Sequence, residues 1–480
     1  MVQYDPKLVD QYVVHLAELS KQQTCIAKED IYNEFGVLLI KKGATISPSH
    51  ADKLNQHRLT KGVDEVLALE NRLTDGDLLD AVLAFLELHP CFFAIHDKNN
   101  FEQALFFLCK AQARNDVLLQ KLTVLKAQFA EDFEETLFIA WFSALLAYKQ
   151  NVPKDEIIAV FTAGLYSNLG LLHIPEAAVQ NPKENREAYQ THPIISSLIA
   201  KATKRHTNAT LLAIMEHHEK PYGDGYPHSK NLERISPLGL LTVTSSTLIE
   251  LMHILPKEQG KNPGIALPYL RINNSLTPNP AFTTALKCIV VAQLPPIWEG
   301  LSINPQEYND FLLDKALAIC QLSACINLLR KLTIVEIGAE SVSQLRAQLQ
   351  RAVALLNSTG FSNLDIIDML SGTQEDELLS VSEMVEFDLI ESDFVNAVRM
   401  IRKCLLELIE SDALEQSDAD QCKEQDAFIA SILEELPADT YFHLLKANDN
   451  DEAEQQNKQD TKASKAPNKT ETVKDSTNEA

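Results

Sequence analysis

The sequence predicts a mainly α-helical protein with one small module of mixed α and β structure at its amino end. Apolar residues recur every three or four positions over most of the chain, a spacing that puts them on one face of a helix. Glycine is scarce, at 15 residues in 480. The strand-like alternation of apolar and polar residues is confined to residues 24–69.

The amino-terminal module is expected to span residues 1–72. Two short turns, Glu34-Phe35-Gly36 and Lys41-Lys42-Gly43, interrupt its β-prone segment. The predicted elements are, in order, a helix over 6–19, strands within 24–47, a helix over 49–57 and a strand over 63–69.

Helical patterns dominate the rest of the chain. They predict a helical connector over 77–130, a helical domain over 131–262 and a further helical region over 281–440. Residues 263–280 are rich in proline and asparagine and are expected to be an irregular linker. The helices predicted in the last region are 281–292, 307–330, 339–357, 364–370, 380–409 and 418–436.

The carboxyl-terminal tail, residues 447–480, contains almost no large aliphatic residues. Such a segment cannot bury enough apolar surface to offset the entropy lost on ordering, so we expect it to be disordered.

Composition excludes several classes of function. A formal net charge of -24 leaves no basic stripe for nucleic acid and repels anionic lipid. No apolar run approaches the length that crosses a bilayer, and the residues after Met1 are charged, so we expect a cytoplasmic protein without membrane insertion. The eight cysteines contain no CxxC pair, which indicates reduced thiols rather than a disulfide or zinc framework.

The most informative segment is HHEKPYGDGYP, from His217 to Pro227. It resembles HHExxDGxGYP, the second signature of the HD-GYP phosphodiesterases. A second segment, LYSNLGLLHIP from Leu165 to Pro175, is similar to their first signature, LLHDIGKIxIP. The resemblance implies a helical HD-superfamily domain. In the family, this domain hydrolyses the bacterial second messenger cyclic di-GMP at a centre of several metal ions.

Most of the family's chemical positions differ in this chain. On this alignment Ser167 replaces a histidine, Asn168 an aspartate and Leu171 a lysine, and Ser246 stands at the last aspartate ligand. Tyr222 takes the place of the aspartate in DGxGYP. Bridging carboxylates both bind and neutralise a pair of cations, so their loss makes a binuclear centre improbable.

Three histidine ligands are retained. His192 fits the family's HP motif, and His217 and His218 are the histidines of HHE. Glu135 aligns loosely with a further ligand position. The resemblance therefore implies a catalytically inactive pseudoenzyme that needs no cofactor. If any metal is bound, we expect one divalent ion (Fe, Mn or Zn) on the three histidines.

Three functions remain open. The first is a binding or regulatory module in bacterial cyclic di-GMP signalling, whose Gly225-Tyr226-Pro227 loop contacts a GGDEF-type protein or whose Lys220 binds the nucleotide. The second is a residual metal-dependent phosphohydrolase with an altered ligand set. The third is a structural interaction module whose old pocket is filled by Leu171 and Tyr222.

Two other histidines are expected to lie outside the site. The pair His96-Asp97 lacks the glycine and lysine that follow the family's HD dipeptide, which predicts an ordinary surface pair. His173 falls at a variable family position, and we expect a solvated or capping role for it.

Overall fold

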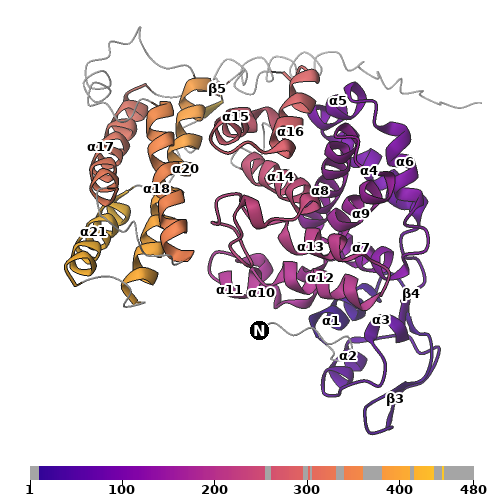
Figure 1. Cartoon of the computed structure of the whole chain (residues 1–480). Coiled ribbons are helices and arrows are strands. Elements are labelled where there is room, and N and C mark those ends of the chain that lie inside the picture. Colours follow the sequence, from indigo (N-terminus) through magenta and orange to yellow (C-terminus); the bar gives the residue numbers. More distant parts are fainter. Residues whose placement is uncertain are drawn as a thin grey trace, which may run out of the picture.

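The chain is mainly helical, as predicted (Figure 1). The structure is a computed structural model, and it describes residues 10–253, 261–295, 301–302, 305–330, 340–359, 381–410, 416–436 and 446–447. The predicted helix over 364–370 and residues 448–480 of the predicted tail lie outside these ranges. Ala447, assigned to that tail, instead pairs with Leu301 across a two-residue ladder.

The amino-terminal module contains three helices and two short antiparallel ladders. Strand β1 pairs with β4, with Cys25 opposite Leu69, and β2 pairs with β3, with Ile31 opposite Ile40. Gly36 and Gly43 both have positive φ, which confirms the two predicted turns. The elements are α1 (Gln11–Leu19), β1 (Cys25–Ala27), β2 (Ile31–Tyr32), β3 (Leu38–Ile40), α2 (Pro48–Asn55), α3 (Val63–Val66) and β4 (Leu67–Leu69).

Two predicted boundaries in this module are wrong. The strand expected over 63–69 begins with a helical turn, because the Glu65 carboxylate accepts a hydrogen bond from the Gly62 amide and caps it. The helix expected from residue 6 begins at Gln11, where the Asp10 side chain accepts the Tyr12 amide as an N-cap. Residues 6–9 lie outside the described ranges.

A buried charge joins the module to the helices behind it. The Lys121 ammonium is fully buried, 3.1 Å from the Asp64 carboxylate and 3.5 Å from the centre of the Tyr12 ring. It also lies 3.1 Å from Nε2 of His173, whose Nδ1 is 2.6 Å from the Asp10 carboxylate. The expectation that His173 is solvated is therefore wrong. Ionic partners from the module hold it instead.

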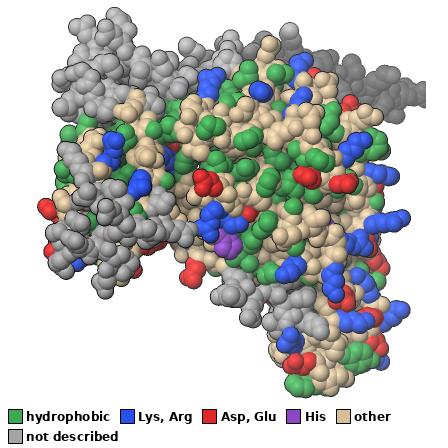
Figure 2. All heavy atoms as spheres, viewed as in Figure 1, with side chains coloured by type: hydrophobic (Ala, Val, Ile, Leu, Met, Phe, Trp, Pro, Cys, Tyr) green, Lys and Arg blue, Asp and Glu red, His purple; other side chains and the backbone are tan. Residues whose placement is uncertain are grey.

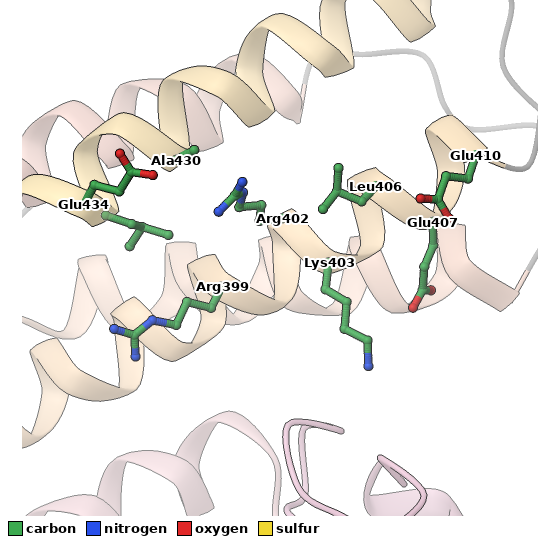
Figure 3. Close-up of a pocket in the computed structure, with 9 residues that line it drawn as sticks. Arg399, Arg402, Lys403, Leu406, Glu407, Glu410, Ala430 and Glu434 are labelled. Carbon is green, nitrogen blue, oxygen red and sulfur yellow. The ribbon is translucent and has the colours of Figure 1, made fainter. Parts of the chain in front are cut away.

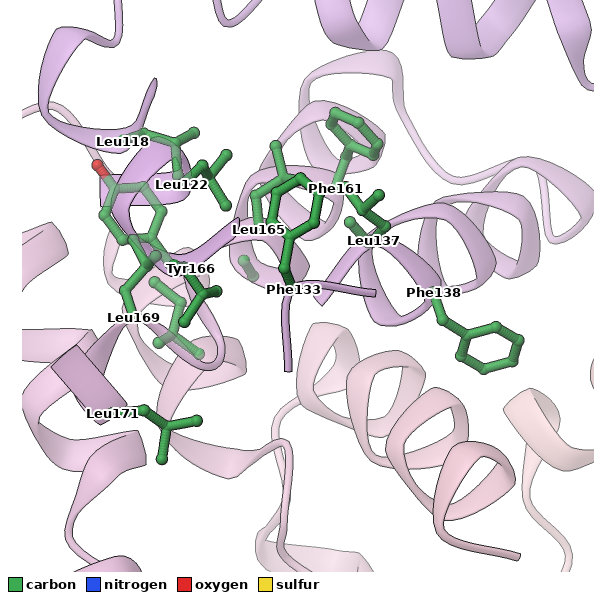
Figure 4. Close-up of a cluster of buried hydrophobic side chains, with 14 of the residues drawn as sticks. Leu118, Leu122, Phe133, Leu137, Phe138, Phe161, Leu165, Tyr166, Leu169 and Leu171 are labelled. Carbon is green, nitrogen blue, oxygen red and sulfur yellow. The ribbon is translucent and has the colours of Figure 1, made fainter. Parts of the chain in front are cut away.

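Helices α4 to α14 follow and share one large hydrophobic core. Figure 4 shows part of it, where Phe133 and Leu137 of α8 lie near Phe161 and Leu165 of α9. The elements are α4 (Asp75–Leu88), α5 (Pro90–Lys98), α6 (Glu102–Lys110), α7 (Asp116–Gln128), α8 (Ala130–Lys149), α9 (Lys154–Tyr166), η1 (Leu169–His173), α10 (Glu176–Gln180), α11 (Arg186–Tyr189), α12 (His192–Ala202), α13 (Asn208–Glu216), η2 (Leu232–Arg234) and α14 (Pro237–Met252).

His96 belongs to this core, which corrects the prediction of a surface pair. Its side chain is buried, and its Nδ1 accepts a hydrogen bond of 3.2 Å from the Trp141 indole. Only the following Asp97 is exposed. The aromatic partner on α8 explains the burial, and the dipeptide alone does not reveal it.

The linker expected over 263–280 is largely helical. It forms η4 (Pro263–Ala266) and α15 (Leu267–Leu276), and α16 (Pro280–Val291) follows. Its prolines lie in the first turns of these helices, where a missing amide hydrogen costs nothing. The irregular composition therefore marks helix starts and not a linker.

The carboxyl-terminal helices have a second hydrophobic core of their own, built around residues such as Leu322, Ala352 and Ile401. The predicted helices are found close to their expected bounds, and in Figure 1 they stand beside the larger helical body. They are α17 (Pro305–Leu329), α18 (Glu340–Thr359), α20 (Val381–Glu410) and α21 (Gln416–Glu435), accompanied by β5 (Leu301–Ser302) and β6 (Lys446–Ala447).

A groove of about 590 Å³ lies between α20 and α21 (Figure 3). Its walls combine cations of α20, among them Arg399 and Lys403, with Glu407 and Glu410 of the same helix and Glu434 of α21. Both signs of charge are interspersed in it, so it does not define an anion site.

The surface shows the same mixture of charges. Figure 2 shows Lys and Arg side chains interspersed with Asp and Glu over the viewed face. Within the described ranges, no single helix is both long and apolar enough to cross a membrane. Helices α4 and α5 meet that criterion only when they are taken together, and they meet at 112°. All eight cysteines are free thiols.

Candidate metal centre

The fold brings His192, His217 and His218 together. Their ligand atoms all lie within 4.8 Å of one another. His192 is the first residue of α12, and His217 is the residue that ends α13. The start of α12 and the end of α13 meet and bring the three imidazoles together, although 25 residues separate His192 from His217.

The second nitrogen of each ring fixes its tautomer. Nδ1 of His192 is 2.8 Å from the Tyr189 carbonyl oxygen, and Nδ1 of His217 is 2.7 Å from that of Ile214. A carbonyl oxygen only accepts, so both Nδ1 atoms carry the proton and donate it. Each Nε2 is then unprotonated and carries a lone pair that can bind a metal ion. This is the arrangement in which proteins hold metal-binding histidines.

The two lone pairs face each other. Nε2 of His192 lies 3.4 Å from Nε2 of His217. Two nitrogens bound to one tetrahedral zinc ion at about 2.0–2.1 Å lie about 3.3–3.4 Å apart. Burial, and then the charge of His218, hold the pKa of both rings well below the ordinary histidine value, so neither is protonated at neutral pH. A cation between the two atoms satisfies both.

The third ring has a carboxylate partner. Nδ1 of His218 is 3.0 Å from the Glu250 carboxylate, which also lies 3.5 Å from the Lys220 ammonium. Desolvation opposes the charge on Glu250, but Lys220 and His218 outweigh it and lower the pKa of this carboxyl to about 2. Glu250 is therefore ionised, and it can hold His218 as a donor at Nδ1.

Glu250 was missed in the sequence, where the carboxylate assigned to the histidine group was Glu135. The signal was present, because Glu250 follows Ser246 by four residues on α14, and residues at that spacing share a helix face. The Ser246 hydroxyl lies 3.3 Å from the same His218 nitrogen. A carboxylate thus occurs one turn beyond the family's aspartate position.

Two further carboxylates stand near the site. Glu135, aligned loosely with a ligand position, does not join the histidine group and pairs instead with His253 at 3.1 Å. Asp132 lies three residues earlier on α8. Burial, and then the charge of Glu135, raise the pKa of Asp132 to about 7.

The substituted positions of the first signature serve the fold. The Ser167 hydroxyl donates to the Gly164 carbonyl at 2.7 Å, and the Asn168 amide donates to the Asp132 carbonyl at 3.4 Å. Leu171 is completely buried in the main core (Figure 4). Next to it, a Cβ at Gly170 would collide with the His192 carbonyl, so this segment packs directly on the start of α12.

The loop after His218 is built by Glu219. Its buried carboxylate accepts the amides of His228 and Lys230, each at 2.7 Å. The same curve brings Gly225 against the backbone of Glu219 and Lys220, where a Cβ would collide. The third residue of HHE therefore shapes the loop.

Tyr226 closes one side of the site. Its ring stacks on His218 with 4.7 Å between ring centres, and its amide donates to the His218 carbonyl at 3.0 Å. The Tyr226–Pro227 peptide bond is cis. His192 and His217 are 0% and 1% exposed and the His218 side chain is 12% exposed, so the histidine group is largely shielded from solvent.

Comparison with known proteins agrees with this geometry. Residues 114–276 match the family model of the HD domain. No match was found among the curated proteins. HD domains typically bind divalent metal ions, and the three histidines lie within the matched residues. The match over the residues that hold them supports membership of this domain in the HD superfamily.

Proposed function

We propose that this HD domain is a binding and regulatory module of bacterial cyclic di-GMP signalling that does not hydrolyse the nucleotide. One observation carries the proposal. At the two positions where the HD-GYP resemblance expects an aspartate and a lysine, Asn168 donates to a backbone carbonyl and Leu171 is buried in the core. Neither side chain can bridge two cations or neutralise a phosphodiester.

The residues present fit one divalent ion. His192, His217 and His218 would hold it, with Glu250 as the carboxylate that orients His218. Three neutral nitrogen ligands suit Zn²⁺, and they also accept Fe²⁺ or Mn²⁺. When bound, such an ion would supply Lewis acidity and a fixed positive charge.

The enclosure of the histidines favours a structural role for that ion. His192 begins α12, His217 ends α13, and His218 opens the loop that Tyr226 closes. An ion on all three would therefore tie two helices and the loop together. Three histidines leave a fourth coordination position open, so this structural role rests on the tie between the segments and not on the ligand set.

The proposed partner surface is the Gly225-Tyr226-Pro227 loop, which would contact a GGDEF-type protein. The alternative ligand, the nucleotide itself, is less favoured, because its expected phosphate contact, Lys220, already lies 3.5 Å from Glu250. Binding a phosphate at Lys220 would require it to leave that carboxylate.

A second candidate function is a one-metal phosphohydrolase. It is favoured by the three lone pairs, because three histidines plus a water molecule are a known catalytic set. Asp132 of α8, with a pKa of about 7, would be a candidate proton donor for such an enzyme.

Turnover separates the two candidates. The full chain, loaded with Mn²⁺, Fe²⁺ or Zn²⁺, would be assayed against cyclic di-GMP and against bis(p-nitrophenyl) phosphate. We expect no hydrolysis above the metal-only blank. Turnover that disappears in His217→Ala would refute the regulatory proposal and establish the enzyme.

A further inference from the structure

The signature loop is in contact with the carboxyl-terminal helices. The Arg351 guanidinium of α18 stacks on the Tyr222 ring at 3.7 Å and lies 3.9 Å from the Asp224 carboxylate. From the same face of α18, Gln348 donates a hydrogen bond to the Tyr222 carbonyl. Tyr222 and Asp224 thus meet one short stretch of a helix more than a hundred residues away.

Helix α20 completes the contact. The Asp393 carboxylate forms an ion pair with Arg351 and accepts a hydrogen bond of 3.2 Å from the Asn273 amide of α15. The Tyr222 hydroxyl donates to the Asn273 carbonyl at 3.3 Å. The side chains of Arg351 and Asp393 are 3% and 7% exposed, so this cluster is a buried junction of four segments.

The junction differs in character from the two cores that it separates. Each core is apolar, and α15 contributes Leu270 to one and Ile272 to the other. At the junction itself, four polar side chains keep atoms that find no hydrogen-bond partner within the described part of the chain. These atoms are Oδ1 of Asp224, Oδ1 of Asn273, Nε and Nη1 of Arg351, and Oε1 of Gln348.

Such a junction fixes how the two helical regions are placed relative to each other but adds little to the stability of the protein. The desolvation of buried charges offsets most of their attraction, and each unsatisfied polar atom adds a further cost. Polar interfaces between parts of one chain are also those that open most readily. Apart from α15 and Leu389 of α20, which packs in the main core, the two cores are joined here through charges, so they can separate with little disruption of either.

We propose that the Tyr222–Asp224 face of the loop is a docking surface whose resident occupant is the carboxyl-terminal helical region of the same chain. Arg351, Asp224 and Asp393 form the latch that holds it, and the latch opens as a unit. Any other protein that binds this face must displace α18. The inference rests on the junction alone and not on the proposed signalling role.

Hydrogen exchange of the full chain tests the latch. The loop amides of Gly223 and Tyr226 donate to the carbonyls of Lys220 and His218, and they report on the loop. We expect Arg351→Gln to raise exchange over residues 220–231 and in α18 by at least roughly tenfold, while α8 and α9 keep their protection. The matched control is Arg346→Gln, an exposed arginine on the same helix, which should leave the loop unchanged.

Two results would overturn the latch. One is an unchanged loop in Arg351→Gln. The other is a rise that includes α8 and α9, since that means general destabilisation. If Arg351→Gln does not fold, Asp224→Asn decides, because it removes one partner of the arginine from the loop side. Loop protection equal to that of the wild type in Asp224→Asn would contradict the proposal. Metal content and hydrolysis do not enter either readout, so failure here is distinct from failure of the proposed function.

Discussion

Removing one imidazole tests whether the three histidines hold an ion. In the chelator-treated full chain, His217→Ala deletes one of the two Nε2 atoms that face each other at 3.4 Å. His192 and His218 remain in place, so the variant keeps two of the three ligands. Two ligands bind a divalent ion far more weakly than three, because each lost bond must be replaced by water.

The magnitude follows from linkage. An ion supplied at 100 times its dissociation constant stabilises the folded state by about 2.7 kcal/mol. For a domain of about 150–250 residues, that corresponds to a rise in the midpoint of thermal unfolding of roughly 5–11 °C. We expect this rise in the wild type on addition of Zn²⁺ or Mn²⁺, and less than roughly a quarter of it in His217→Ala.

The assay is thermal unfolding with and without metal, paired with metal content by mass spectrometry. His206→Ala is the matched control, because His206 lies outside the group and its Nε2 lies 3.4 Å from the Tyr166 hydroxyl. It should keep the full metal-dependent rise. Equal rises in the wild type and in His217→Ala, or no rise and no bound metal in the wild type, would refute the reasoning.

Three other predictions concern the frame around the site. Asp132 has a folded-state pKa of about 7, above its ordinary 3.8, so its stabilising contribution is present below pH 4 and is lost as the pH rises through 7. At pH 8 the free energy of unfolding of Asp132→Asn should therefore exceed that of the wild type by up to about 4 kcal/mol, less after solvent screening, and at pH 4 by little. Urea unfolding measures both differences, and equal gains at the two pH values would contradict this. Gly225→Ala should lower the free energy of unfolding by about 1–3 kcal/mol, because the added Cβ meets backbone. Gly76→Ala, where the nearest atom is 3.6 Å away, should lower it by less than about 0.5 kcal/mol. Equal losses would count against the close approach at Gly225. Lys121→Met should cost about 3–5 kcal/mol by leaving the Asp64 carboxylate without its partner, and should speed proteolysis of residues 10–72; an unchanged digestion pattern would show that the buried charge does not hold the module.

The sequence predicts most of the helices, because their apolar spacing reflects the cores directly. It fails where one tertiary partner decides the outcome. His96 is buried by the Trp141 indole, and His173 by the Asp10 carboxylate, and neither partner is close in the sequence. It also fails at residues 263–276, where prolines that start helices look the same as prolines that end them.

The candidate site, like the fold, could be predicted from the sequence only in part. The resemblance to the HD-GYP motifs indicates His192, His217 and His218, and the fold brings them together. Glu250 is invisible to a motif comparison because it lies one helical turn from the expected position. The contact of Tyr222 with Arg351 is beyond any local pattern, since it joins separate regions of the chain.

The three histidines also differ in their surroundings from the positions where the HD-GYP resemblance expects carboxylates. His192 and His217 are set by backbone carbonyls of Tyr189 and Ile214, which survive any side-chain substitution. Asn168 and Ser246, where the HD-GYP resemblance expects aspartates, carry no carboxylate in this chain. Loss of those carboxylates would abolish a bridged pair of ions and leave one tridentate position intact. On our proposal, the surviving position keeps an ion for the loop that α18 now covers, which is why metal content and latch opening must be measured separately.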